Sequence, residues 1–147
     1  MKKLLLFVLA SAFSALVQAQ SLDPKSLPEA VNSSFSTNYP NARNMVWNKA
    51  GKKYNVSFNI DSGMHRVVLK DTGAPVSHQY PIALSSLPQD VISGVQREFE
   101  GAKIQSADKI EEESNVKYQL TFPAGDSSVK IIMSDRGIYL KNLSEER

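Results

Sequence analysis

Two histidines are the side chains in this sequence best suited to acid–base or metal chemistry. His65 stands near the start of an expected strand, and His78 lies in or near a later one. An imidazole titrates near neutral pH and binds transition metals, so the pair could act as an acid–base couple or hold an ion. The sequence has no His-Glu-x-x-His, Gly-x-Ser-x-Gly, Ser-x-x-Lys or phosphate-binding loop. We therefore expect ordinary strand or surface histidines, no metal site and no enzyme.

Acidic side chains offer a second kind of chemistry, the binding of Ca²⁺ by carboxylate oxygens. Glu111-Glu112-Glu113 is a run of three, but consecutive residues of a strand point to opposite faces and cannot all reach one ion. We expect this run at the solvated tip of a hairpin. Asp61-Ser62-Gly63, Asp71-Thr72-Gly73 and Asp135-Arg136-Gly137 combine the residue types that tight turns require. We expect no cofactor at any of these positions.

Polar side chains on two expected strands form the candidate binding surface. They alternate with apolar residues, so each strand has one buried and one wet face. The sole Trp of the chain lies on an earlier expected strand and could anchor a partner, because Trp is common in interface hot spots. The candidate partner-binding residues are Trp47, Asn55, Ser57, Asn59, Lys117, Gln119 and Thr121. The alternative is a plain solvated sheet face, with the Trp packed at the edge of the core.

An internal repeat predicts the elements that position these residues. Ser26-Leu27-Pro28-Glu29-Ala30-Val31 recurs 60 residues later as Ser86-Leu87-Pro88-Gln89-Asp90-Val91. Each copy predicts a helix with Ser as N-cap and with Glu or Gln three residues later, the spacing of a capping box. Apolar residues then step by four along each helix, as Val31, Phe35 and Tyr39 and as Val91, Val95 and Phe99. The helices are expected to stop at Pro40-Asn41 and at Gly101.

Strands follow each predicted helix. The alternation over 54–60 and 116–122 is typical of strands with one buried face, and further strands are expected near 65–69, 76–80, 128–133 and 138–143. The fold class is therefore α+β, with tandem duplicated units of a helix plus an antiparallel meander and with both helices on one face of the sheet. We place a linker at 20–25, the first repeat at 26–82 and the second at 83–147, and we expect the two repeats to form one compact unit.

The N-terminus predicts export. Residues 1–19 have the charged start, the apolar stretch and the small residues at Val17 and Ala19 that are typical of a secretory signal peptide, with cleavage near Ala19. The 147-residue chain has no Cys and a formal net charge of +2. Loss of Lys2 and Lys3 leaves 15 Lys and Arg against 15 Asp and Glu, a net charge of zero. We expect a bacterial periplasmic or secreted protein with no membrane anchor and no nucleic-acid partner.

The order and spacing of the short motifs resemble the PepSY-like, β-lactamase-inhibitor-like proteins exported by Bacteroidetes. The matching motifs of the first copy are Leu27-Pro28-x-x-Val31, Tyr39-Pro40-Asn41-Ala42, Tyr54, Val56 and Asp71-Thr72-Gly73. Those of the second copy are Leu87-Pro88-x-x-Val91, Phe99-Glu100-Gly101-Ala102, Tyr118 and Asp135-Arg136-Gly137. Lys70 and Ser134 stand where that family has an aromatic residue. The resemblance implies a fold similar to that of β-lactamase inhibitory protein, and it carries no catalytic residues.

The function expected from these observations is a non-enzymatic, exported binding module. Its open sheet face would bind or inhibit an envelope protein. The alternative is a periplasmic sensor or carrier that binds a small molecule or a metal.

Overall fold

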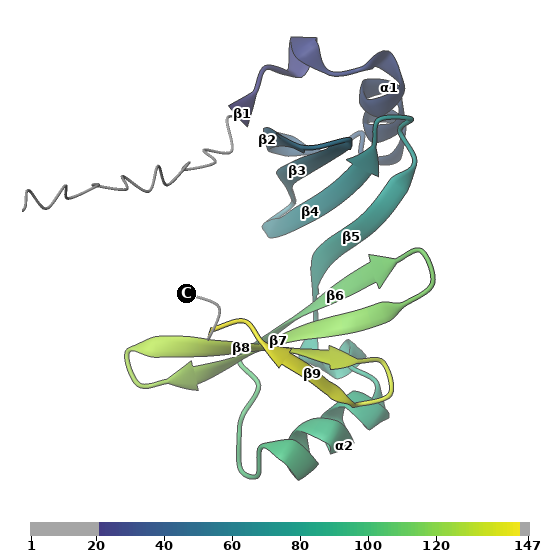
Figure 1. Ribbon diagram of the computed structural model, residues 1–147. Helices are drawn as coiled ribbons and strands as arrows, with labels where there is room; N and C mark the ends of the chain where they lie inside the picture. The colour runs from purple at the N-terminus through teal and green to yellow at the C-terminus, as the bar shows by residue number, and fades with distance from the viewer. Residues whose placement is uncertain (1–20, 145–147) are drawn as a thin grey trace, which may run out of the picture.

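The computed structural model describes residues 21–144, which form one antiparallel sheet with two helices packed against it (Figure 1). The nine strands lie in the sheet in the order of the sequence, from β1 to β9. This arrangement confirms the expected combination of helices with an antiparallel sheet. The expected signal peptide and its cleavage site near Ala19 lie outside the described residues. No helix within residues 21–144 is long and apolar enough to cross a membrane.

Both halves of the described chain run through a 3₁₀ turn, an α-helix and four strands, and the N-terminal half begins with one further short strand. The N-terminal half contains β1 (Ser21–Leu22), η1 (Pro24–Ser26), α1 (Glu29–Asn38), β2 (Arg43–Ala50), β3 (Lys53–Ile60), β4 (Gly63–Lys70) and β5 (Pro75–Ile82). The C-terminal half contains η2 (Leu84–Ser86), α2 (Gln89–Glu98), β6 (Ser106–Glu112), β7 (Val116–Ala124), β8 (Ser127–Ser134) and β9 (Tyr139–Asn142). Strands β5 and β6 pair with each other and so join the two halves into one sheet.

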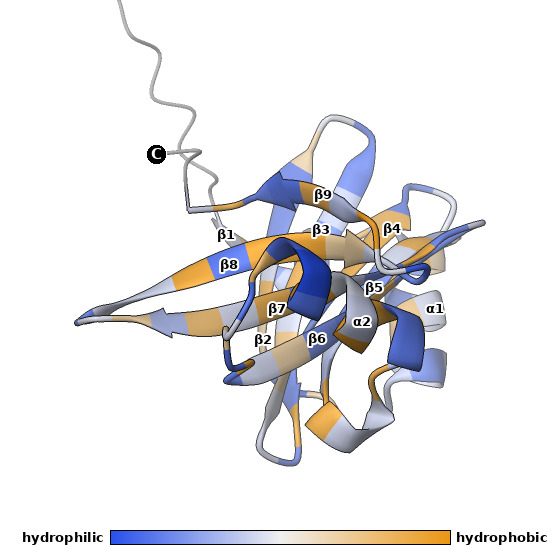
Figure 2. Cartoon of the chain, turned by 90° about the horizontal axis from the view of Figure 1, so that it is seen from below, coloured by the Kyte–Doolittle hydropathy of each residue, from blue (hydrophilic) through white to orange (hydrophobic). Residues whose placement is uncertain are grey.

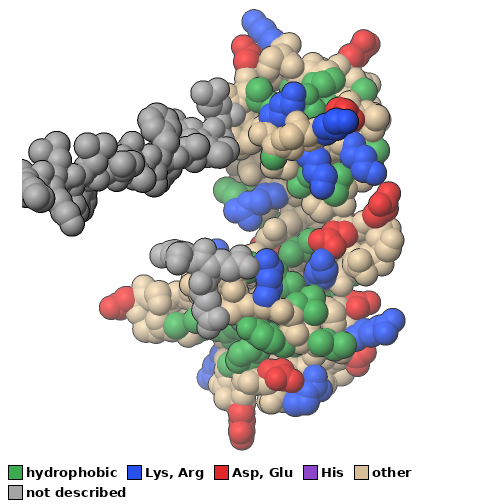
Figure 3. All heavy atoms as spheres, viewed as in Figure 1, with side chains coloured by type: hydrophobic (Ala, Val, Ile, Leu, Met, Phe, Trp, Pro, Cys, Tyr) green, Lys and Arg blue, Asp and Glu red, His purple; other side chains and the backbone are tan. Residues whose placement is uncertain are grey.

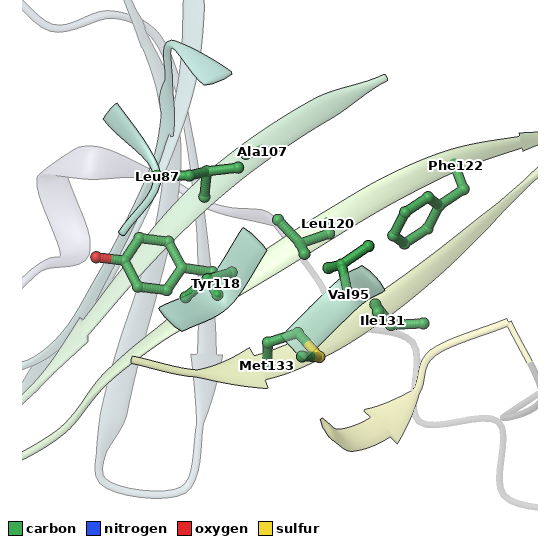
Figure 4. Packing of buried hydrophobic residues seen from close by; sticks show 9 residues of the cluster. Leu87, Val95, Ala107, Tyr118, Leu120, Phe122, Ile131 and Met133 are labelled. Carbon is green, nitrogen blue, oxygen red and sulfur yellow. The ribbon is translucent and has the colours of Figure 1, made fainter. Parts of the chain in front are cut away.

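Both helices cover the same face of this sheet. The apolar stripe of α1 buries Val31 and Phe35, and that of α2 buries Val91 and Val95. Alternate strand residues meet these stripes, and the change from apolar to polar along the strands is visible as orange and blue bands in Figure 2. The result is two apolar clusters, one under each helix. Figure 4 shows the second cluster, in which Leu120, Ile131 and Met133 pack beneath Val95.

The helices begin differently from the expectation. Pro28 and Pro88 occupy the N-cap positions, and neither helix has a side-chain capping hydrogen bond. Ser26 and Ser86 instead end the 3₁₀ turns two residues earlier, and the Ser26 hydroxyl donates back to the Asp23 carbonyl. The predicted capping boxes are therefore wrong, because an extended Leu-Pro step separates each Ser from its helix.

Two Asp-x-Gly turns set the distance between helix and sheet. Gly73 has a φ of +82° and Gly137 a φ of +72°, in the left-handed region that favours glycine. A Cβ added to Gly73 would collide with the Ala30 carbonyl of α1, and one added to Gly137 would collide with the Asp90 carbonyl of α2. Gly94 of α2 meets the backbone of Gly137 in the same way. Each helix thus lies in backbone contact with the turn between the last two strands of its own half.

Replacement of Gly73 by Ala tests this contact. The added methyl group meets both the left-handed backbone and the helix, so we expect a loss of about 2–4 kcal/mol in the free energy of unfolding. The matched control is Gly51→Ala, because Gly51 has a φ of +60° but nothing lies within 4 Å of its added Cβ. The control should lose only about 1–2 kcal/mol from backbone strain. Equal losses in urea unfolding would contradict the helix contact.

Candidate functional site

The sheet face turned away from the helices is the first candidate site, and we call it the open face. Cross-strand partners share a face, so the register follows it across the sheet. Ser57 pairs with Arg66, Arg66 with Gln79, and Gln79 with Ile110, which pairs with Lys117. The strand residues on this face therefore extend without a break from β3 to β7, opposite the two apolar clusters.

Six of the seven sequence-predicted binding residues lie on the open face. Asn55, Ser57 and Asn59 alternate with the buried residues of β3, and Lys117, Gln119 and Thr121 do the same on β7. All six are half-buried. The structure does not bring the two triplets together, because β4, β5 and β6 lie between them.

Trp47 does not belong to this surface, and its prediction needs correction. Its side chain is only 2% exposed and packs edge-to-face on Phe35 of α1, with ring centroids 4.9 Å apart. The cause is register, since Trp47 pairs with Val56, which points toward the helix. The sole Trp is a core residue under α1.

Hollows on the open face bring in residues that the sequence analysis did not select. One hollow of about 610 Å³ joins Arg66 of β4 and Asp108 of β6 to Gln119, Thr121 and Lys130. A second, of about 400 Å³, includes Lys117 and Gln119 among its lining residues. The sequence did contain a signal for Arg66. If the strands on either side of the Asp61-Ser62-Gly63 turn are paired as a hairpin, Arg66 lies opposite Ser57.

Hydrogen bonds and an ion pair connect the polar side chains in the middle of the open face. The Gln79 and Gln119 amides both donate to one carboxylate oxygen of Asp108, at 2.9 and 3.3 Å. The Lys117 ammonium lies 2.7 Å from the Glu112 carboxylate. These bonds hold the amide and ammonium groups in place, so the middle of the face is a fixed polar surface.

The second candidate site lies on the helix side of the central strands, beside the C-terminal end of α1. We call it the imidazole cluster, and it consists of Tyr39, Phe58, His65, His78 and Tyr80. Its rings contact one another, with centroids 5.4 Å apart for Phe58 and His65 and 4.6 Å apart for His78 and Tyr80. Tyr39, which caps α1, lies edge-on to His78 at 5.2 Å. Both histidines are half-buried.

The two histidines bond to each other. Nδ1 of His65 lies 3.0 Å from Nε2 of His78, and the ring centroids are 5.3 Å apart. The centroid distance is close to the N···N distance plus one ring radius at each end, so the two nitrogens point straight at each other. That geometry is an N–H···N hydrogen bond, with one nitrogen donating and the other accepting.

The in-line contact does not favour a metal centre at this pair. Two imidazole nitrogens on one ion would converge on it at an angle, which brings the rings closer together. Among residues 21–144 no group of three or more His, Cys, Asp or Glu side chains could hold a metal ion. The two rings can share one proton in their hydrogen bond. In the sequence, the signal that could have revealed the pair is the Asp71-Thr72-Gly73 turn, because a hairpin through this turn brings the strands of His65 and His78 side by side.

The run of three Glu residues is not wholly a hairpin tip, as the sequence had suggested. Glu111 and Glu112 belong to β6, and only Glu113 lies beyond its end. The Glu111 carboxylate turns to the helix side, where it accepts a hydrogen bond from the Tyr80 hydroxyl at 3.0 Å and lies 2.6 Å from the Lys109 ammonium. The hydrogen bond from Lys109 lowers the pKa of Glu111.

Burial favours the neutral form of both histidines. It lowers the pKa of His65, against the opposing effect of Asp61. Burial and the neighbouring His65 lower the pKa of His78, against the opposing effect of Glu111. Near pH 7 the pair is therefore neutral, and one ring donates its N–H to the bare nitrogen of the other.

These pKa shifts predict the direction of a pH effect on stability. Because the folded-state pKa values lie below the unfolded value near 6.5, the unfolded chain takes up protons first as the pH falls. The contribution of the two histidines to the free energy of unfolding is complete above about pH 6.5 and decreases below it. The decrease for each histidine is less than the limit of about 1.4 kcal/mol per pH unit. The measurement is urea unfolding at several pH values, for the wild type and for His65→Gln/His78→Gln. An equally steep decrease in the variant would contradict this role.

Comparison with known proteins gives a fold and no family. No protein-family model and no curated protein sequence matches the chain. A DUF2874 family protein from Bacteroides ovatus is 18% identical, with a TM-score of 0.64 over 82% of this chain and 90% of that one. A BLIP-like protein from Bacteroides fragilis is 17% identical, with a TM-score of 0.61 over 82% and 89%. A Bacteroides eggerthii protein described as periplasmic is 17% identical, with a TM-score of 0.65 over 79% and 87%. The chain therefore has the fold of the DUF2874 and BLIP-like proteins of Bacteroides.

Proposed function

We propose that this protein is an exported, non-enzymatic binding module whose open face meets a protein partner. The observation that carries the proposal is the unbroken open face itself. Helices cover one side of the sheet, and the other side presents a continuous, hollowed surface of fixed polar groups. Figure 3 shows the molecule hollowed between its upper and lower halves.

The mixture of side chains on this face suits a protein better than a small molecule. Val46 pairs with Ser57 and Met64 pairs with Asn59, so both apolar residues lie among the polar ones on the open face. They are 50% and 54% exposed. Protein interfaces combine apolar contacts with hydrogen-bonding groups over a broad area, whereas small-molecule sites are deep and mostly apolar.

The remaining parts of the proposal concern origin and location. The similarity to a protein described as periplasmic supports export, with removal of residues 1–19 after Ala19. The matched order of elements in the two halves supports a tandem repeat of a PepSY-like unit, at 26–82 and 83–147. The likeness to a BLIP-like protein is compatible with inhibition of an envelope protein as the purpose of binding.

Site-specific photo-crosslinking in the producing cell tests which face is used. A photoreactive residue is placed at Ser57 or at Thr121 on the open face, and control probes are placed at the exposed Asn32 of α1 and Gln96 of α2. We expect the two open-face probes to yield the same protein adduct and the helix probes to yield none. Adducts from the helix positions alone, or from none of the four, would reject the proposed surface.

A further inference from the structure

The charges of this protein are unevenly divided between its two sides. By strand register the open face carries seven basic strand residues, namely Arg43, Lys53, Arg66, Lys70, Lys117, Lys130 and Lys141. Its acidic strand residues are two, Asp108 and Glu112. The face therefore has a formal charge of +5. Without residues 1–19 the chain has a net charge of zero, so all its other residues together carry −5. Blue Lys and Arg side chains are visible over both the upper and the lower half of the molecule in Figure 3.

The acidic groups near this face are already engaged. Asp108 accepts hydrogen bonds from the two glutamines, and Glu112 pairs with Lys117. Glu113, at the neighbouring hairpin tip, lies 3.9 Å from Lys70. Within residues 21–144, by contrast, Arg66 and Lys130 form no ion pair. An incoming carboxylate would thus meet two cations that form no ion pair, beside an Asp108 carboxylate that is already hydrogen-bonded by the two glutamine amides.

Arg66 and Lys130 reach the same place from different halves of the chain. Arg66 is on β4 and Lys130 on β8, and both line the hollow of about 610 Å³. The walls of that hollow also include the Gln119 amide and the apolar Met64. Asp108 also lines the hollow, so its three charged groups are two exposed cations and one hydrogen-bonded carboxylate, a net charge of +1. With an amide and an apolar wall beside them, these groups fit a carboxylate that is carried on a polypeptide.

We propose that the open face binds an acidic segment of a protein, with Asp or Glu side chains of the partner seated between Arg66 and Lys130. This inference rests on the proposed function and names the chemistry of the partner. The hollowed shape disfavours a flat bilayer, which could touch only the rim. The exposed apolar residues disfavour a polyanionic polysaccharide, which has no apolar side chains to cover them.

Selection from a random peptide library on the immobilised full chain tests the proposal. We expect the selected peptides to be enriched in Asp and Glu beside apolar residues. Arg66→Glu/Lys130→Glu should weaken their binding by about tenfold or more, and Arg66→Gln/Lys130→Gln should weaken it less. The matched control, Lys25→Glu/Arg136→Glu, has the same change in net charge at exposed positions off the open face and should bind as the wild type does.

Two further comparisons separate this proposal from the one on which it rests. Thr121→Trp fills the same hollow without any change in charge. If the selected peptides are neutral and are lost with Thr121→Trp but not with the charge variants, the open face is a binding site and the acidic partner is wrong. If no open-face variant changes binding, both proposals are wrong.

Tighter binding of heparin or of phosphatidylserine vesicles than of any selected peptide would also overturn the acidic protein segment. Thermal melts of all variants confirm that each is folded.

Discussion

The close approach of each helix to an Asp-x-Gly turn is the contact on which the rest of this structure depends. A glycine at 73 and another at 137 let the turn touch helix carbonyls that any side chain would push away. The helix then lies low enough for its apolar stripe to fill the space above the strands. Because this occurs in both halves and on the same side, one face of the sheet is covered and the other is left bare. The open face is thus a consequence of where the helices lie.

The sequence predicted the helices and most strands, because their apolar residues repeat with periods of four and two. It did not predict where the helices begin. The Ser before each Leu-Pro step and the Glu or Gln after it have the spacing of a capping box, but the Leu-Pro step is extended and the helix begins only after the Pro. It placed Trp47 on the wrong side of the sheet, because the local sequence Met45-Val46-Trp47 does not indicate which of these side chains faces the helix. Arg66 and Lys130 were missed for a related reason. They line one hollow only through the pairing of five successive strands, which no short sequence pattern records.

The imidazole cluster lies on the helix side of the sheet, in the central region that neither helix covers. The two helices cover the apolar clusters of their own halves, and the central strands between them carry rings and hydrogen-bonding groups. His78 of β5 pairs across the strand with Glu111 of β6, so the junction of the halves is polar and half-buried. Its groups satisfy one another, with His65 bonded to His78 and Tyr80 to Glu111. A junction of this kind can be wet without leaving a buried polar group unpaired.

The ends of the sheet have a consequence for the behaviour of the protein in concentrated solution. A meander of antiparallel strands has two free edges, and a long, flat edge invites the strands of another molecule to pair with it. Here the outermost strands are very short, two residues in β1 and four in β9. The strand inside the first edge has a register shift between Arg43 and Val46, and the last pair has one between Ile132 and Met133. Within residues 21–144 both edges therefore combine a short outer strand with irregular pairing, two features that oppose strand addition by a second molecule.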